Sequence, residues 1–162
     1  MNDDTMRTAA LVGTLTTACA VSGGVATNPK SAWYKALDKP AWQPPGAIFP
    51  VVWTGLYADI AVTTTLAIDE LEGSGRNAEA QALRRALVVN LVLNQAWSWS
   101  FFKGRALGPA TVVAALLAGS SIDLVRRVGR AGRGKGFALA PYAAWCSFAT
   151  ALTGEIWRRN RR

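Results

Sequence analysis

The fold of this 162-residue chain is decided by residues 86–125, which read ALVVNLVLNQAWSWSFF-KGR-ALGPATVVAALLAGSSIDLV. Two apolar segments, 86–102 and 106–125, are separated by three residues of which two are basic. An α-helix rises about 1.5 Å per residue, so about 20 residues cross the roughly 30 Å hydrocarbon layer of a bilayer. The stretch therefore predicts two neighbouring transmembrane helices joined by a short charged turn.

Three further apolar segments flank this pair, at 8–26, 47–68 and 137–157, and the charged residues gather between them. Residues 70–79 are expected to form a polar turn and residues 126–135 a basic turn, because both stretches combine charges with glycines. A soluble helical protein would instead spread its charges along the outer face of each helix. The first segment also resembles a signal peptide, but the acidic residues before it weaken the positive start that such a peptide needs. We therefore expect a single all-α domain over residues 1–162, an integral membrane bundle of five transmembrane helices.

Residues 27–46 differ in kind, because they combine prolines with aromatic and basic side chains. Proline removes a backbone donor and disfavours helix in the residue before it. Trp33, Tyr34 and Trp42 alternate with lysines, and amphipathic aromatics beside lysines are typical of the membrane–water interface. The segment is expected to form a long ordered loop over one end of the bundle.

The net charge of +8 raises the question of nucleic-acid binding. A nucleic-acid reader carries its basic residues as a surface on a folded domain. Here they border apolar segments, where they meet lipid headgroups, so the bilayer and not a nucleic acid is the expected partner. The 18 basic residues divide evenly between the two ends of the five-helix arrangement, so the positive-inside rule favours neither orientation.

The chain contains no histidine, and its two cysteines, Cys19 and Cys146, lie inside apolar segments. The lack of histidine excludes a hydrolytic triad built on that residue and argues strongly against a zinc site. We interpret both cysteines as small apolar packing residues. No metal site and no tightly bound cofactor is expected.

Deep tryptophans and amides mark a candidate binding site. Trp53, Trp97 and Trp145 lie inside apolar segments, where an indole N–H needs a partner. Asn90 and Asn94 are four residues apart and share one helix face, and amides at this depth must point toward other helices or a cavity. Structural hydrogen bonds between helices and contacts with a ligand explain them equally well. An aromatic pocket with a few amides suits a large, flat, apolar ligand.

Asp59 is an isolated acid about 13 residues into the segment 47–68. An ionisable residue inside a membrane is costly and often functional. It supports an alternative function, a proton-coupled small-molecule transporter in which Asp59 and the amides of the third segment line the pathway.

Small residues recur at every fourth position of the fourth segment, at Ala106, Ala110, Ala114 and Ala118. Such a stripe lets helix backbones approach closely in lipid. Packing within the same bundle is favoured over a dimer interface.

Four stretches together resemble the TspO/MBR family, the tryptophan-rich sensory or translocator proteins. Residues 33–45 match its loop pattern WY-x(2-3)-L-x-KP-x-W-x-PP, and 49–57 (FPVVWTGLY) resemble the start of its second helix. Residues 93–102 match LN-x-x-W-x-x-x-FF, and 141–152 match PY-x-x-W-x-x-F-A-x-x-L. The stretches occur in the family's order and span nearly the whole chain.

The resemblance implies a five-helix bundle, commonly a homodimer, with a pocket under the first loop. Family members bind porphyrins; mammalian members also bind cholesterol and isoquinoline carboxamides, and some bacterial members degrade protoporphyrin in light. It therefore implies a multi-pass protein of the bacterial inner (plasma) membrane. The expected function is that of a receptor or sensor with porphyrin as ligand. Light-dependent degradation of the porphyrin and a role in stress regulation are further expectations from the resemblance.

The resemblance also assigns site residues. Trp53 and Trp145 match the two tryptophans of the photochemistry. The lysines of the loop, Lys30, Lys35 and Lys39, are expected to meet porphyrin propionates. The pocket-lining positions are matched by Trp42, Trp53, Tyr57, Asn94, Trp97, Phe101 and Trp145.

The chain departs from the family pattern at several positions. Thr153 replaces an asparagine, and Gly154 replaces the tyrosine of the mammalian cholesterol motif, which argues against sterol recognition. Asp59 stands where apolar or small residues are usual.

Overall fold

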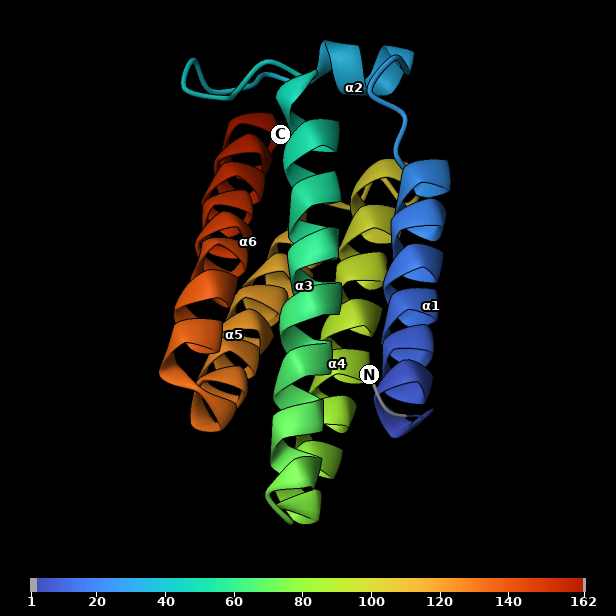
Figure 1. Ribbon diagram of the computed structural model, residues 1–162. Coiled ribbons are helices and arrows are strands. Elements are labelled where there is room, and N and C mark those ends of the chain that lie inside the picture. Colours follow the sequence, from blue (N-terminus) through green and yellow to red (C-terminus); the bar gives the residue numbers. More distant parts are fainter. Residues whose placement is uncertain (1–2, 162) are drawn as a thin grey trace.

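The computed structural model describes residues 3–161, with side chains from Thr5 onward, and the regular structure in that range is helical throughout. This confirms the all-α prediction. Five long helices run side by side with a short helix lying across one end (Figure 1). The long helices are α1 (Asp3–Ala26), α3 (Ile48–Gly73), α4 (Asn77–Ser98), α5 (Leu107–Ala131) and α6 (Arg133–Asn160). The short helix is α2 (Ala32–Ala36), and a π-helical turn, η1 (Trp99–Lys103), directly follows α4.

Three of the described helices, α1, α3 and α5, are long and apolar enough to cross a membrane. Helices α4 and α6 are of similar length but less apolar, α4 because of its Asn and Gln residues and α6 because of the charged residues near its ends. Large apolar side chains cover the outside of the bundle, and such a surface suits lipid better than water. Examples are Val21, Val25, Val51, Val62, Val92, Val112, Leu116 and Phe137.

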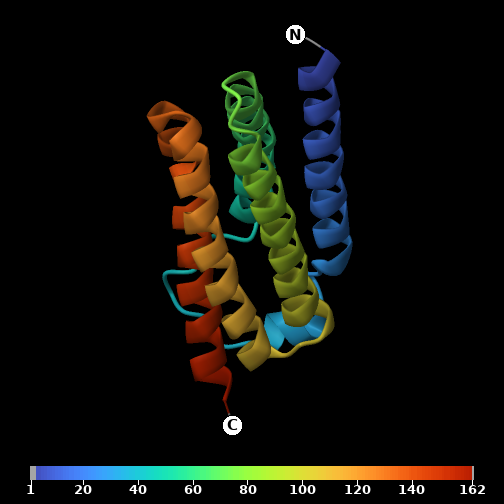
Figure 2. The ribbon, with the colours of Figure 1, turned by 90° about the horizontal axis from the view of Figure 1, so that it is seen from below.

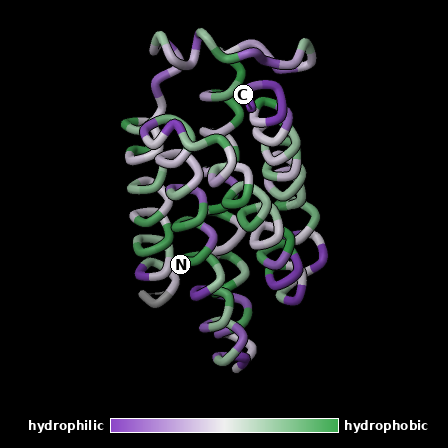
Figure 3. Tube along the Cα trace, turned by 180° about the vertical axis from the view of Figure 1, so that it is seen from behind, coloured by the Kyte–Doolittle hydropathy of each residue, from purple (hydrophilic) through white to green (hydrophobic). Residues whose placement is uncertain are grey.

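The connections between the long helices lie at alternate ends of the bundle, as expected when successive helices run in opposite directions. Helix α2 and the chain's C-terminus lie at one end, and the turns α3–α4 and α5–α6 lie at the other (Figure 1). Seen from below, α5 and α6 form one side of the bundle and α1 the other, with α3 and α4 between them (Figure 2). Hydrophilic positions concentrate at both ends of the trace (Figure 3), where charged side chains would meet water and headgroups.

Two predicted polar turns are shorter than expected. The turn expected over 70–79 is confined to residues 74–76, and the basic turn expected over 126–135 is confined to Gly132. Those expectations were wrong because Glu, Arg and Lys are good helix formers, so the helices continue past the apolar segments. The ion pair of Arg84 with Glu72, at 2.6 Å, joins the ends of two such extensions.

Small residues bring α5 and α6 close together. A Cβ added at Gly136 would lie 2.9 Å from the Gly129 Cα atom. Ala110, Ala114 and Ala118 of the predicted small-residue stripe are buried, and α5 contacts α6 more extensively than any other helix. The stripe therefore serves packing within the bundle, which is the use favoured from the sequence.

Candidate functional site

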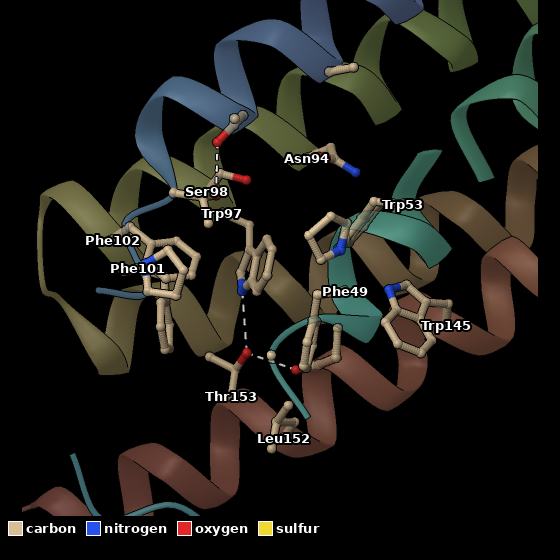
Figure 4. Close-up of a pocket in the computed structure, with 18 of the residues that line it drawn as sticks. Phe49, Trp53, Asn94, Trp97, Ser98, Phe101, Phe102, Trp145, Leu152 and Thr153 are labelled. Atoms are coloured by element: carbon tan, nitrogen blue, oxygen red, sulfur yellow. Dashed lines mark hydrogen bonds between the residues drawn. The ribbon is translucent and has the colours of Figure 1, made fainter. Parts of the chain in front are cut away.

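A cavity of about 360 Å³ lies under the loop 27–46, between α1, α3, α4, η1 and α6 (Figure 4). This volume is within the range of small-molecule sites. The lining is mostly aromatic and apolar: Ala20, Gly23, Gly24, Thr27, Pro29, Tyr34, Gln43, Gly46, Phe49, Pro50, Trp53, Thr54, Tyr57, Asn94, Trp97, Ser98, Phe101, Phe102, Trp145, Ala149, Leu152, Thr153 and Ile156.

One wall is a row of rings that we call the first aromatic row: Tyr57, Trp53, Trp97 and Phe101. Adjacent ring centroids are 5.6, 6.2 and 6.0 Å apart, and each pair is tilted by 32°. Residues four apart lie on one helix face, so α3 supplies the first two rings and the end of α4 with η1 supplies the others. All four side chains reach the cavity.

The second aromatic row runs Phe49, Trp145, Phe148 and Trp42. Its centroid distances are 5.7, 5.2 and 5.8 Å. Phe49 and Trp145 face the cavity, whereas Phe148 and Trp42 do not line it. Trp42 is half exposed and packs on the edge of Phe148. Six of the seven residues expected to contact a ligand therefore line the cavity, and Trp42 lies outside the lining, against Phe148.

The π-helical turn η1 adds a further ring to the site, Phe102, beside Phe101 of the first aromatic row. The Gly104 amide donates to the Trp99 carbonyl at 2.8 Å, a five-residue step. Such wide turns often occur at functional sites. The Phe101 and Phe102 centroids are 4.9 Å apart, and both rings line the cavity. The sequence suggested an uninterrupted helix here.

The amides of α4 divide between the two roles left open by the sequence. Asn90 is fully buried; it accepts a 2.6 Å hydrogen bond from Tyr142 and donates one to Ser121 at 3.1 Å, so it is a structural link. Asn94 accepts from Tyr57 at 2.8 Å and also lines the cavity. Gln95 donates to the Cys19 Sγ atom at 2.6 Å. Cys19 therefore joins a polar network, beyond the apolar packing expected of it.

The buried polar atoms of the cavity residues differ in whether they have a hydrogen-bond partner. Trp97 Nε1 donates to Thr153 Oγ1 at 3.3 Å (Figure 4). In contrast, Trp145 Nε1 and Gln43 Oε1 are buried without a hydrogen-bond partner among the residues that the structure describes. An unpaired buried polar atom is costly. A ligand with one acceptor and one donor would satisfy both.

Charged residues are absent from this lining. Asp59 is partly exposed on α3 and does not reach the cavity. Lys39 Nζ donates to the Leu37 carbonyl at 3.0 Å and lies 4.8 Å from the centre of the Tyr34 ring. Burial raises the pKa of Tyr34 above its ordinary value, so its hydroxyl stays protonated. The transporter hypothesis, which needed Asp59 beside the amides, gains no support from this arrangement.

Sequence reasoning missed part of the site. Tyr34 and Gln43 come from the loop, Thr153 comes from α6, and Gly23 and Gly24 form the α1 wall. The glycine pair inside an apolar helix was the one local signal, because glycine there often marks a close approach.

Similarity to known proteins agrees with the geometry. The model of the TspO/MBR family matches residues 10–158. The chain is 32% identical to the tryptophan-rich protein TspO of Chlorobaculum tepidum over 99% of both chains. It is 31% identical to protein CrtK of Rhodobacter capsulatus, over 88% of this chain and 87% of that one. It is 32% identical to the translocator protein of Homo sapiens, over 79% of this chain and 75% of that one. The chain therefore belongs to the TspO/MBR family of membrane proteins.

Proposed function

We propose that this protein is a membrane receptor that binds porphyrins, such as protoporphyrin and haem-type tetrapyrroles, in the aromatic cavity. The observation that carries the proposal is the pair of aromatic rows, with Trp53 and Trp97 in one and Trp145 in the other, all lining one space. A flat apolar macrocycle gains most from stacking on such rings.

The polar periphery of a porphyrin also finds matching groups. Trp145 Nε1 can donate to a peripheral carboxylate, which would give this unpaired buried donor a partner. Lys30 and Lys35 are exposed and adjoin Pro29 and Tyr34 of the cavity wall, which supports a role for them in meeting carboxylates at the mouth. Lys39 is already engaged by backbone carbonyls.

Light-dependent porphyrin breakdown is part of the proposal. Trp53 or Trp145 would transfer one electron to the photoexcited macrocycle, leaving an indole radical cation and a reduced porphyrin. Dissolved dioxygen would be the oxidant for the later opening of the ring. The residues' role is to hold an oxidisable indole against the ligand.

The setting of this receptor is also proposed. All five long helices cross the inner membrane of a bacterium, α4 and α6 included, because their polar residues pair inside the bundle or lie near its ends. The homodimer implied by the family remains a prediction, and the alanine stripe of α5 is not its interface because it is buried within the bundle. A stress-regulatory role would follow from porphyrin occupancy.

The experiment is a titration of the purified protein with protoporphyrin in the dark, followed by illumination. The proposal predicts a saturable shift of the Soret band and then its light-driven loss. A Soret band that never shifts at saturating protein contradicts porphyrin binding, and a shifted band that is stable in light contradicts photodegradation alone.

A further inference from the structure

The middle of the loop 27–46 is fastened to the last residue of α6. The Asp38 amide donates to Asn160 Oδ1 at 3.0 Å, and Asn160 Nδ2 donates to the Asp38 carbonyl at 2.9 Å. The same Nδ2 donates to the Ile156 carbonyl at 2.8 Å. The Asn160 side chain is thus fixed on its own helix and pairs with both backbone polar groups of one loop residue, Asp38.

An ion pair reinforces this contact. Arg159 Nη1 lies 3.6 Å from Asp38 Oδ1, and Arg159 Nε donates to Glu155 Oε1 at 2.8 Å. The Asp38 carboxylate is 63% exposed, so solvent weakens its attraction to Arg159. The paired hydrogen bonds of Asn160 are therefore the more specific part of the contact.

The contact lies next to the cavity in both segments. Tyr34 and Gln43, on either side of Asp38 in the loop, line the cavity and are joined by a 3.3 Å hydrogen bond from Gln43 Nε2 to the Tyr34 hydroxyl. Ile156, one turn before Asn160, lines it as well. A movement of the loop away from α6 would therefore remove part of the cavity wall.

The chemistry of the contact suits a reversible closure. Exposed hydrogen bonds are each weak in net terms, so they can break without unfolding the bundle. Prolines at Pro29, Pro40 and Pro44 limit the loop's own freedom, so it can move as one piece. Its other attachments include ring contacts, such as Trp33 on Phe101, and the packing of Leu37 on the same apolar cluster.

We propose that Asn160 is a latch that holds the loop closed over the cavity and sets how fast a ligand enters and leaves. The latch is a property of the ligand-free chain, and its effect on ligand rates rests on the proposed function. If the loop closes in the same way over an occupied cavity, loss of the latch speeds entry and exit together and leaves the dissociation constant nearly unchanged.

The first test needs no ligand. Hydrogen–deuterium exchange of the loop is compared in the full-length protein, Asn160→Ala and the matched control Arg161→Ala. Arg161 is the neighbouring tail residue and stacks on Trp157, 5.1 Å from its centroid. We expect the amides of residues 34–46 to exchange about tenfold faster in Asn160→Ala and at the wild-type rate in Arg161→Ala. Equal exchange in all three proteins overturns the latch.

The second test uses protoporphyrin and stopped-flow tryptophan quenching. The association and dissociation rate constants should both rise about tenfold in Asn160→Ala, with a change below about threefold in the dissociation constant. Faster loop exchange with unchanged rate constants overturns the control of ligand access. Failure of protoporphyrin to bind even the wild-type protein contradicts the proposed function, and the exchange experiment then still decides the latch.

Discussion

The hydroxyl of Tyr57 donates a hydrogen bond to Oδ1 of Asn94 at 2.8 Å, and this bond lies within a chain that joins all five long helices. The thiol of Cys19 donates to Tyr57, Asn94 donates to Tyr142, Tyr142 to Asn90, and Asn90 to Ser121. Every donor points the same way along the chain. The cavity residues Tyr57 and Asn94 are thereby held by the bundle interior.

Tyr142→Phe is expected to destabilise the protein by about 1–3 kcal/mol, because it leaves the buried Asn90 Oδ1 and Asn94 Nδ2 without this partner. The free energy of unfolding in denaturant measures the loss. The control is Ser147→Ala on the same helix, since the Ser147 hydroxyl bonds to the Ala143 carbonyl and to no other group that the structure describes. Equal stabilities of the two variants would contradict the importance of the chain.

Gly136→Ala is expected to destabilise the α5–α6 pair by about 1–3 kcal/mol, a typical cost of overpacking. Its methyl group would lie 2.9 Å from Gly129 Cα and 3.3 Å from the Val125 carbonyl. Gly134→Ala is the matched control, because an added Cβ there meets nothing within 4 Å. The thermal midpoint should fall for the first variant and stay or rise for the second. A fall of similar size in both would argue against close packing at Gly136.

Thr153→Val is expected to weaken protoporphyrin binding about fivefold. It removes the acceptor that holds the Trp97 indole, and a hydrogen bond of about 1 kcal/mol corresponds to that factor. Isothermal titration would measure the affinity. Thr150→Val, one turn earlier in α6, should bind as the wild type does, since the Thr150 hydroxyl bonds to the Cys146 carbonyl of its own helix. Unchanged affinity in Thr153→Val would show that Trp97 needs no such support.

If tryptophans of the cavity donate the electron, replacing them should slow porphyrin photodegradation, whereas replacing a tryptophan outside the cavity should not. Phenylalanine is much harder to oxidise than tryptophan, so Trp53→Phe and Trp145→Phe should retain bound porphyrin but lose its Soret band more slowly in light, by about tenfold when combined. Trp99→Phe is the control, since Trp99 is exposed and bonded to Ser22. Decay at the wild-type rate in the double variant would exclude these indoles as electron donors.

The sequence predicts the helices better than the ends of the helices. Apolar segments identify where α1, α3 and α5 lie, because lipid demands long apolar runs. The charged residues at 70–79 and 126–135 favour turns by their polarity, yet helix continues through most of both stretches. Hydropathy reports what a residue faces, and it says little about where the backbone stops.

The sequence predicts the aromatic residues that line the cavity, but it does not predict the contacts that position the loop beside them. Trp53 and Trp97 follow from motif and depth, and both line the cavity. The position of Trp42 behind Phe148 depends on how the proline-rich loop folds over α6. The hydrogen bonds between Asp38 and Asn160 join residues 122 apart in the chain. No local sequence pattern around either residue indicates them.

The most direct measurement is a dark titration of tryptophan fluorescence with protoporphyrin in wild type, Trp145→Phe and Trp99→Phe. If the aromatic cavity is the binding site, quenching is saturable in all three proteins. The affinity then falls about fivefold in Trp145→Phe alone, because the ligand loses the hydrogen bond from the otherwise unpaired Nε1. Quenching that does not saturate, or that weakens equally in Trp99→Phe, would contradict a porphyrin site in this cavity.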